Sequence, residues 1–298
     1  MMLPGLLFFV FSLVNDVRTS IARHDMASAQ ALAQAYQKQA GATPELAAAL
    51  SWIARGEWDA HDLPQADRYA VETRKMALAL LGMRRLDADP WLPTALGAAI
   101  EVHAEVLAAE GQRPEAISFL REQLGAYGGT SIGERIRKNL NLLDLEGKPA
   151  PALDAGDWLG ARPPALANLR GHPVLLFFWA HWCVDCKGEA PIVASLMAQY
   201  GPKGLLLVAP TKLYGYAAGG EPAAPAAEKQ YIERVRAQYY PMLASVPMPL
   251  SAANFLNYGV STTPTIALVD RAGVVRFYHP GAVSEAELSQ RIQKLLGR

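Results

Sequence analysis

The chain has 298 residues, of which 51% are hydrophobic and 19% charged, and its 28 basic and 28 acidic side chains balance to a formal net charge of zero. This length and composition favour a globular protein of about two domains and argue against a disordered chain. Balanced charge without basic runs offers no electrostatic basis for binding nucleic acid, so no nucleic-acid partner is expected. The 2 cysteines form a single closely spaced pair, which excludes a scaffold held by several disulfides.

The N-terminal stretch over residues 3–14 (LPGLLFFVFSLV) is mostly apolar. It has the length of a signal-peptide core and is too short to span a bilayer. No Lys or Arg precedes it, and no Ala-x-Ala cleavage pattern follows it before Asn15 and Asp16. Residues 1–14 are therefore open to three interpretations: a signal, an anchor remnant or a buried first helix.

The next part of the chain shows helical periodicity and almost no strand pattern. Apolar residues recur every three or four positions, as at Leu46, Leu50 and Ile53. Thr43 and Pro44 suit the N-cap and the first position of a helix. The helix pairs resemble units of a tetratricopeptide-type array, although no strict repeat of about 34 residues emerges. We expect an all-α helical-hairpin domain over residues 1–146. It could cover, space or dimerise the catalytic domain, or bind a peptide on a concave face.

A change of composition near Gly147 and Pro149 marks the predicted domain boundary, because glycine and proline become frequent and helical periodicity stops. Strand and helix patterns alternate from there to residue 298. Strands are predicted over 174–180, 204–210, 265–270 and 274–279, and helices over 184–200, 228–240, 251–258 and from Ser284 onward. The continuous apolar run 174–180 is typical of a central strand buried on both faces.

Cys183 and Cys186 lie where this predicted strand runs into a helix. Cys183 falls at the helix N-terminus, where free N–H groups and the helix dipole favour the thiolate. Cys186 lies about one turn further on, close enough for a short disulfide. The arrangement indicates thiol–disulfide chemistry.

The residues from Phe178 to Pro191 (FWAHWCVDCKGEAP) resemble the active-site segment of TlpA-like thiol–disulfide oxidoreductases in the thioredoxin superfamily. The segments 147–151, 169–174 and 259–265 (GVSTTPT) are similar to the same family, so the resemblance spans residues 147–298. It implies an α/β thioredoxin-like fold, with a mixed central sheet and flanking helices, after the all-α domain. The predicted order of strands and helices agrees with this fold.

The resemblance also assigns roles to residues. It implies that Cys183 attacks a substrate disulfide and that Cys186 resolves the mixed disulfide. It implies that Trp182 packs beside the thiols, that Pro264 is in the cis form and that the Thr263 backbone pairs with a substrate strand. The implied enzyme reduces protein disulfides with no cofactor beyond its own redox-active disulfide. Its partners would be a protein or small thiol or disulfide substrate and an electron donor.

Residues around the motif modify this expectation. Glu189 follows Cys186 by about one helical turn, at a position where family members carry an acidic residue that tunes the thiols. A partly buried carboxylate there could move a proton or raise a thiol pKa, and the alternative is a solvated helix residue. Val184 and Asp185 supply no cation to stabilise the thiolate of Cys183. We therefore predict a reductase-like potential near that of thioredoxin, about −270 mV.

Tyr214 and Tyr216 lie in an insertion over residues 212–222, after the second predicted strand. Loops after parallel strands emerge at the end of the sheet that carries the cysteines. We expect the two tyrosines to contact substrate, unless the insertion is a flexible surface loop. His181 could assist proton transfer or simply mark the polar end of its strand.

The alternative function is metal delivery or redox sensing through the same cysteine pair, with the helical domain as the partner-binding module. Two cysteines are half of a structural zinc site, and no second Cys or His pair has ligand spacing, so no metal ligand is assigned. A peroxidase is disfavoured because residues 178–182 lack the Pro and Thr that precede a peroxidatic cysteine. The resemblance implies a bacterial protein in the periplasm or tethered to the membrane facing it, while the residues do not exclude the cytoplasm.

Overall fold

A computed structural model describes residues 12–82 and 84–297. Most of the apolar N-terminal run, and with it the choice between a signal, an anchor and a buried helix, lies outside the described residues. The chain forms two compact units, Met1–Ile132 and Gly133–Arg298.

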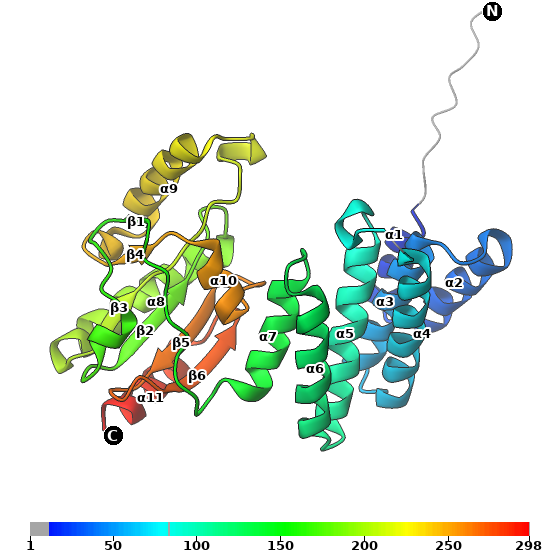
Figure 1. Cartoon of the computed structure of the whole chain (residues 1–298), viewed down its shortest axis with the longest axis horizontal. Coiled ribbons are helices and arrows are strands. Elements are labelled where there is room, and N and C mark those ends of the chain that lie inside the picture. The colour runs from blue at the N-terminus through cyan, green and yellow to red at the C-terminus, as the bar shows by residue number, and fades with distance from the viewer. Residues whose placement is uncertain (1–11, 83, 298) are drawn as a thin grey trace, which may run out of the picture. The chain divides into compact units, whose positions relative to one another are not determined.

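The first unit is all-helical, as the periodicity predicts (Figure 1). Its elements are α1 (Leu13–Ala22), α2 (Met26–Ala40), α3 (Pro44–Asp59), α4 (Leu63–Leu81), the short 3₁₀ helix η1 (Leu86–Ala88), α5 (Leu92–Ala109) and α6 (Arg113–Tyr127). Helices that follow each other along the chain pack together. The predicted cap of α3 is confirmed, since the Thr43 hydroxyl accepts a hydrogen bond from the N–H of Leu46 at 3.1 Å and Pro44 occupies the first turn.

The centre of this unit is α5. Among the described residues, α5 is the one helix that is long and apolar enough to cross a membrane. Much of α5 is buried within the unit, where it packs against α3, α4 and α6. Its alanines, including the fully buried Ala95, Ala98 and Ala99, allow neighbouring helices to approach closely. Packing within the unit therefore accounts for the apolar character of α5.

The second unit contains the predicted strands and helices in the predicted order, and in addition α7 and the short strands β1 and β4, which pair with each other. Its elements are α7 (Gly133–Asp144), β1 (Trp158–Leu159), η2 (Leu166–Leu169), β2 (Val174–Phe178), α8 (Val184–Tyr200), η3 (Gly201–Lys203), β3 (Leu206–Val208), η4 (Ala218–Gly220), α9 (Pro225–Tyr239), η5 (Pro241–Leu243), β4 (Met248–Pro249), α10 (Ala252–Tyr258), β5 (Thr265–Val269), β6 (Val275–Pro280) and α11 (Glu285–Leu296). The main sheet has the order β3-β2-β5-β6, with β2 and β3 parallel and the other pairs antiparallel. This mixed sheet with flanking helices is the expected thioredoxin-like fold.

Strand β2 is buried on both faces, which confirms the interpretation of its apolar run. Because side chains alternate along a strand, Leu175 and Phe177 face one side and Leu176 and Phe178 the other. The first pair belongs to the core beneath α8, α9 and α11. The second pair belongs to the core that holds the aromatic side chains of α10. The strand that leads into the cysteines is thereby fixed on both sides.

Helix α7 packs within the second unit, against α10 and β6. The contact depends on Gly259, which has φ +64°, because a Cβ there would lie 2.3 Å from the backbone nitrogen of Lys138. The compact unit therefore begins at Gly133, ahead of the composition change near Gly147.

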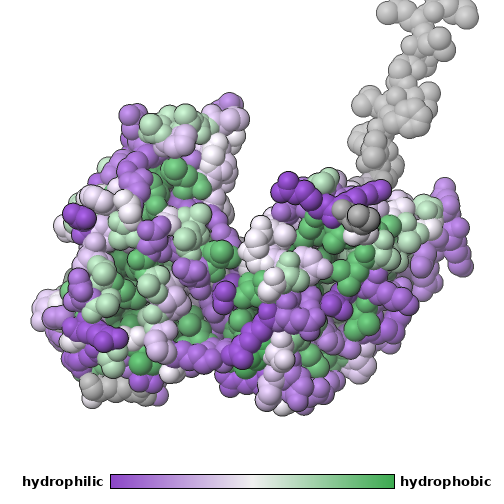
Figure 2. All heavy atoms as spheres, in the orientation of Figure 1, coloured by the Kyte–Doolittle hydropathy of each residue, from purple (hydrophilic) through white to green (hydrophobic). Residues whose placement is uncertain are grey.

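The two units carry mixed surfaces. On the face shown in Figure 2, hydrophilic side chains are spread over each unit, and hydrophobic side chains form small groups among them. Large apolar side chains gather inside the units instead, as the buried cores of the second unit show. Exposed large hydrophobic side chains are therefore informative, and two of them, Trp182 and Val184, adjoin Cys183.

Candidate active site

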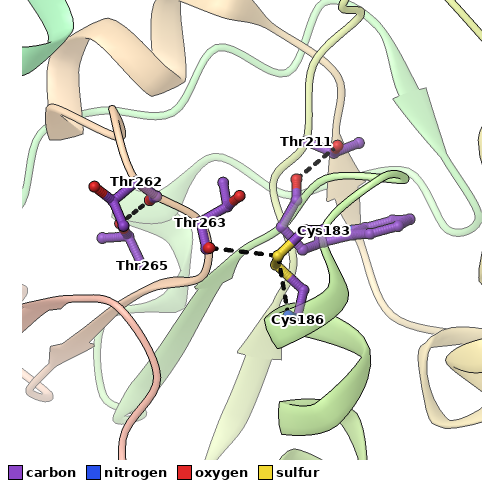
Figure 3. Close-up of a disulfide and its surroundings, with 7 residues drawn as sticks. Cys183, Cys186, Thr211, Thr262, Thr263 and Thr265 are labelled. Atoms are coloured by element: carbon purple, nitrogen blue, oxygen red, sulfur yellow. Dashed lines mark hydrogen bonds between the residues drawn. A yellow bond between two sulfur atoms is a disulfide. The ribbon is translucent and has the colours of Figure 1, made fainter. Parts of the chain in front are cut away.

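Cys183 and Cys186 form a disulfide at the start of α8. Cys183 is the N-cap of this helix, and the N–H of Cys186 donates to its Sγ at 2.9 Å. The turn before Cys183 is held by the segment that follows β3, because the Thr211 hydroxyl donates to the carbonyl oxygen of Trp179 at 2.9 Å (Figure 3). The sulfur of Cys183 is thus placed at a helix N-terminus, where the peptide dipoles stabilise a thiolate.

The loop before β5 faces the disulfide. Its Thr263–Pro264 peptide bond is cis, as the resemblance implies. The carbonyl oxygen of Thr263 points at the sulfur of Cys183, at a distance of 3.4 Å (Figure 3). The hydroxyl of Thr265 donates to the carbonyl of Thr262 at 2.6 Å and stabilises the loop. In the disulfide form this sulfur has no proton, whereas a Cys183 thiol could donate to Thr263.

The rim of the disulfide is hydrophobic and exposed. Cys183 itself is 2% exposed, yet its neighbours Trp182 and Val184 are 44% and 77% exposed. Exposed large apolar side chains at one place indicate a surface that contacts another molecule. A partner reaching Cys183 would touch this rim.

Glu189 lies about one turn beyond Cys186 on α8 and is 3% exposed. It is therefore not a solvated helix residue. One carboxylate oxygen accepts a hydrogen bond from the N–H of Val283 at 3.2 Å. Burial raises the pKa of the Glu189 carboxyl, and the Val283 hydrogen bond partly opposes this change. Such a carboxyl can hold a proton more readily than an ordinary glutamate, which its proposed tuning role requires.

The insertion after β3 lies against the cysteine motif. The Tyr214 ring centroid is 5.5 Å from that of Trp182, with the planes nearly perpendicular. The Tyr214 hydroxyl is buried, and burial raises its pKa above that of an ordinary tyrosine. Tyr216 is half-buried and approaches His181, with ring centroids 5.3 Å apart. The structure thus brings both predicted tyrosines to the vicinity of the disulfide.

His181 is 1% exposed and so does not form a polar exit from the sheet. Its Nε2 lies 3.3 Å from Oε1 of Glu228, which is also buried. Burial lowers the pKa of His181, and the Glu228 carboxylate opposes this change only in part. The imidazole is accordingly neutral at neutral pH and supplies no positive charge to a Cys183 thiolate.

Sequence reasoning missed Glu228, because a glutamate within a helical pattern normally looks solvated. The available signal was its place in the first turns of α9, just after the tyrosine-bearing loop. Side chains of a helix lean toward its N-terminus, so this carboxylate reaches back to the loop.

A metal-delivery role would need ligands in addition to the cysteine pair. In residues 12–82 and 84–297, no group of three or more His, Cys, Asp or Glu side chains is placed to hold a metal ion. The cysteine pair itself is engaged in the disulfide.

Comparison with known proteins agrees with this fold and site. Residues 164–296 match the family model of a thioredoxin-like domain. The chain is 29% identical over 147 residues to the thioredoxin-like protein YneN of Bacillus subtilis, covering 49% of this chain and 78% of that protein. It is 28% identical over 156 residues to the thiol:disulfide interchange protein DsbE of Xylella fastidiosa, covering 51% of this chain and 70% of that protein. It is 27% identical over 149 residues to the thiol-disulfide oxidoreductase ResA of Geobacillus thermodenitrificans, covering 50% of this chain and 77% of that protein.

The second unit therefore contains a thioredoxin-like domain homologous to thiol–disulfide oxidoreductases. The matched family model begins at residue 164, beyond the helical first unit.

Proposed function

We propose that this protein is a thiol–disulfide oxidoreductase that reduces disulfides of other proteins through Cys183 and Cys186. The observation that carries the proposal is the cysteine pair at the N-terminus of α8, with the sulfur of Cys183 facing the carbonyl of Thr263. The homologous thiol:disulfide interchange protein supports the same reaction class.

The reaction begins with the reduced dithiol. The Cys183 thiolate attacks one sulfur of a substrate disulfide, the substrate S–S bond breaks, and a mixed disulfide forms. The departing substrate thiolate takes up a proton. The Cys186 thiolate then attacks the sulfur of Cys183, the mixed disulfide breaks, and the second substrate sulfur leaves as a thiolate that takes up a proton. Two electrons pass to the substrate, and a dithiol donor must afterwards reduce the Cys183–Cys186 disulfide.

Glu189 supports the second step in this proposal. The Cys186 thiol must lose a proton before it can attack, and it is fully buried. A carboxylate with a raised pKa on the same helix is suited to accept that proton, directly or through water. The role of Glu189 is thus to control when the mixed disulfide is resolved.

The substrate contacts proposed here surround Cys183. The backbone of Thr263 beside Pro264 would pair with an extended substrate segment, as in β-strand addition. Trp182, Tyr214 and Tyr216 would contact substrate side chains. The exposed indole of Trp182 supports this assignment.

We also propose that the helical first unit binds a partner and that the protein works on the periplasmic side, free or tethered to the membrane. A cleft of about 290 Å³ in the first unit supports partner binding; it is lined by Ala70, Val71, Arg74, Lys75, Leu78, His103 and Phe119. Fusion of alkaline phosphatase to the C-terminus tests location, because this reporter is active only after export. An intact fusion without phosphatase activity would contradict the periplasmic location.

Reduction of insulin tests the activity. The protein is reduced with dithiothreitol, freed of the reagent and mixed with insulin, and the new insulin thiols are counted. We expect reduction by the unmodified protein and none by Cys183→Ser. Cys186→Ser should instead hold insulin as a mixed disulfide that disappears on adding a reductant. Equal reduction by Cys183→Ser and the unmodified protein would contradict the proposal, and stoichiometric zinc on the reduced protein would favour metal delivery.

A further inference from the structure

Glu228 joins three parts of the second unit that are distant in sequence. Its Oε1 accepts a hydrogen bond from the N–H of Tyr214 at 2.5 Å, and its Oε2 accepts one from the N–H of Gly215 at 2.8 Å. Its Oε1 also lies 3.3 Å from Nε2 of His181. Both carboxylate oxygens are therefore satisfied by donors of the tyrosine-bearing loop and of the turn before Cys183.

A buried carboxylate with such donors has a strong structural effect. Glu228 is completely buried. Hydrogen bonds to an ionised acceptor are about twice as strong as neutral ones, and removing the acceptor leaves buried N–H groups unsatisfied. Gly215 adopts φ +84°, so the loop turns at the point where the carboxylate holds it.

The loop that Glu228 holds is the one against the active site. The rings of Tyr214, Tyr216 and Tyr231 all meet His181 at steep angles, with centroids 5.3 to 5.6 Å away. Tyr214 also contacts Trp182, the residue next to the attacking cysteine. A continuous chain of contacts thus leads from Glu228 through the loop to the rim of the disulfide.

We propose that Glu228 is a positioning residue that holds the loop of residues 212–217 against Trp182 and thereby favours protein disulfides over small ones. The inference rests on the proposed function. A protein substrate must lie across the rim and gains contacts from an ordered loop. A small disulfide needs access only to the sulfur of Cys183 and gains little from the loop.

The test compares Glu228→Gln with Glu233→Gln in the full chain. Glu233 lies on the same helix and pairs with Arg236 at 2.6 Å, away from the loop contacts. In Glu228→Gln the side-chain amide replaces one acceptor oxygen by a donor, so one backbone N–H loses its partner. Each variant is assayed with insulin and with bis(2-hydroxyethyl) disulfide, and is digested briefly with chymotrypsin.

For Glu228→Gln we expect kcat/KM for insulin to fall about tenfold, the size of effect that one lost charge-assisted hydrogen bond can produce. The value for the small disulfide should stay within about twofold, and chymotrypsin should cut after Tyr214 or Tyr216. Glu233→Gln should match the unmodified protein in both reduction assays and in the chymotrypsin digestion. An equal change for both disulfides, no change for either, or a protected loop would overturn the inference.

A second variant covers the case in which Glu228→Gln does not fold. Gly215→Ala strains the loop side of the same contact, where a Cβ meets no other atom, and leaves the carboxylate in place. It should show a smaller change in the same direction, and unchanged selectivity would count against the inference. If the unmodified protein reduces neither disulfide, the proposed function fails, and chymotrypsin still decides whether Glu228 holds the loop.

Discussion

The carbonyl oxygen of Thr263 lies 3.4 Å from the sulfur of Cys183, although 80 positions separate the two residues in the chain. The contact joins the loop before β5 to the N-terminus of α8. It places a hydrogen-bond acceptor beside the sulfur that would attack a substrate. The helix N-terminus on one side and a backbone edge on the other define the chemistry expected of this site.

The first prediction concerns the reduction potential. We expect about −270 mV, because Val184 and Asp185, the two residues between the cysteines, supply no cation to stabilise the reduced form. His181 is buried beside Glu228 with a lowered pKa, and the Lys187 ammonium lies over the Tyr239 ring at 4.5 Å. Equilibration with glutathione buffers, followed by alkylation and mass measurement, gives the potential. A value above about −150 mV would be closer to that of strong oxidants and would refute the prediction.

The second prediction concerns the tyrosines at the rim. The double variant Tyr214→Ala and Tyr216→Ala should lower kcat/KM for insulin about two- to tenfold, because an aromatic contact contributes about 0.5–1.5 kcal/mol beyond its burial. Tyr127→Ala, at the end of α6 in the first unit, is the matched control. Unaltered insulin reduction by the double variant would show that the loop is only a surface loop.

The third prediction concerns acid stability through His181. Its pKa is lowered in the folded protein, so below about pH 6.5 the unfolded chain binds more protons than the folded one. Its contribution to stability is complete above that pH and is lost as pH falls toward the folded pKa, by at most about 1.4 kcal/mol per pH unit. Urea unfolding from pH 7 to 5 should show a shallower loss in His181→Gln. The control His172→Gln, at an exposed position, should keep the full slope; an unchanged slope in His181→Gln would contradict the prediction.

The fourth prediction concerns Glu189, whose burial raises its pKa. A raised pKa means that the folded state loses stability as the pH rises above about 4.3, the pKa of a glutamate in the unfolded chain. Below that pH the carboxyl is protonated in both states and this loss is absent. Glu189→Gln cannot ionise, so we expect it to be more stable than the unmodified protein at pH 7 and equally stable near pH 4. The pH dependence of Cys186 alkylation should shift in the same variant. The control Glu233→Gln should change neither the stability nor the pH dependence of Cys186 alkylation. An unshifted alkylation profile in Glu189→Gln would contradict the tuning role of Glu189.

The fifth prediction concerns the attachment of α7. Gly259→Ala should destabilise the second unit by about 2–5 kcal/mol, because the new methyl group meets the backbone of Lys138 and the residue has positive φ. Gly147→Ala is the control, since Gly147 has φ +86° with nothing within 4 Å of the added Cβ. It should cost only about 1–2 kcal/mol. Similar losses in chemical denaturation of the two variants would show that α7 can move away.

Much of the second unit was predictable because its signals are local. The apolar run of β2, the cysteine spacing and the start of the last helix at Ser284 each depend on a few adjacent residues. The order of strands and helices then restricts the sheet to few topologies. The resemblance added the cis form of Pro264, which the residues alone would not have favoured.

The sequence by itself therefore determined the fold class and the redox pair, since hydrophobic period and cysteine spacing are properties of neighbouring positions. Only the tertiary structure decided that Glu228 holds the tyrosine loop beside His181 and that α7 packs with the redox unit through Gly259. Those contacts join positions far apart in the chain. Their energies come from burial and from complementary donors and acceptors, and neither exists until the chain is folded.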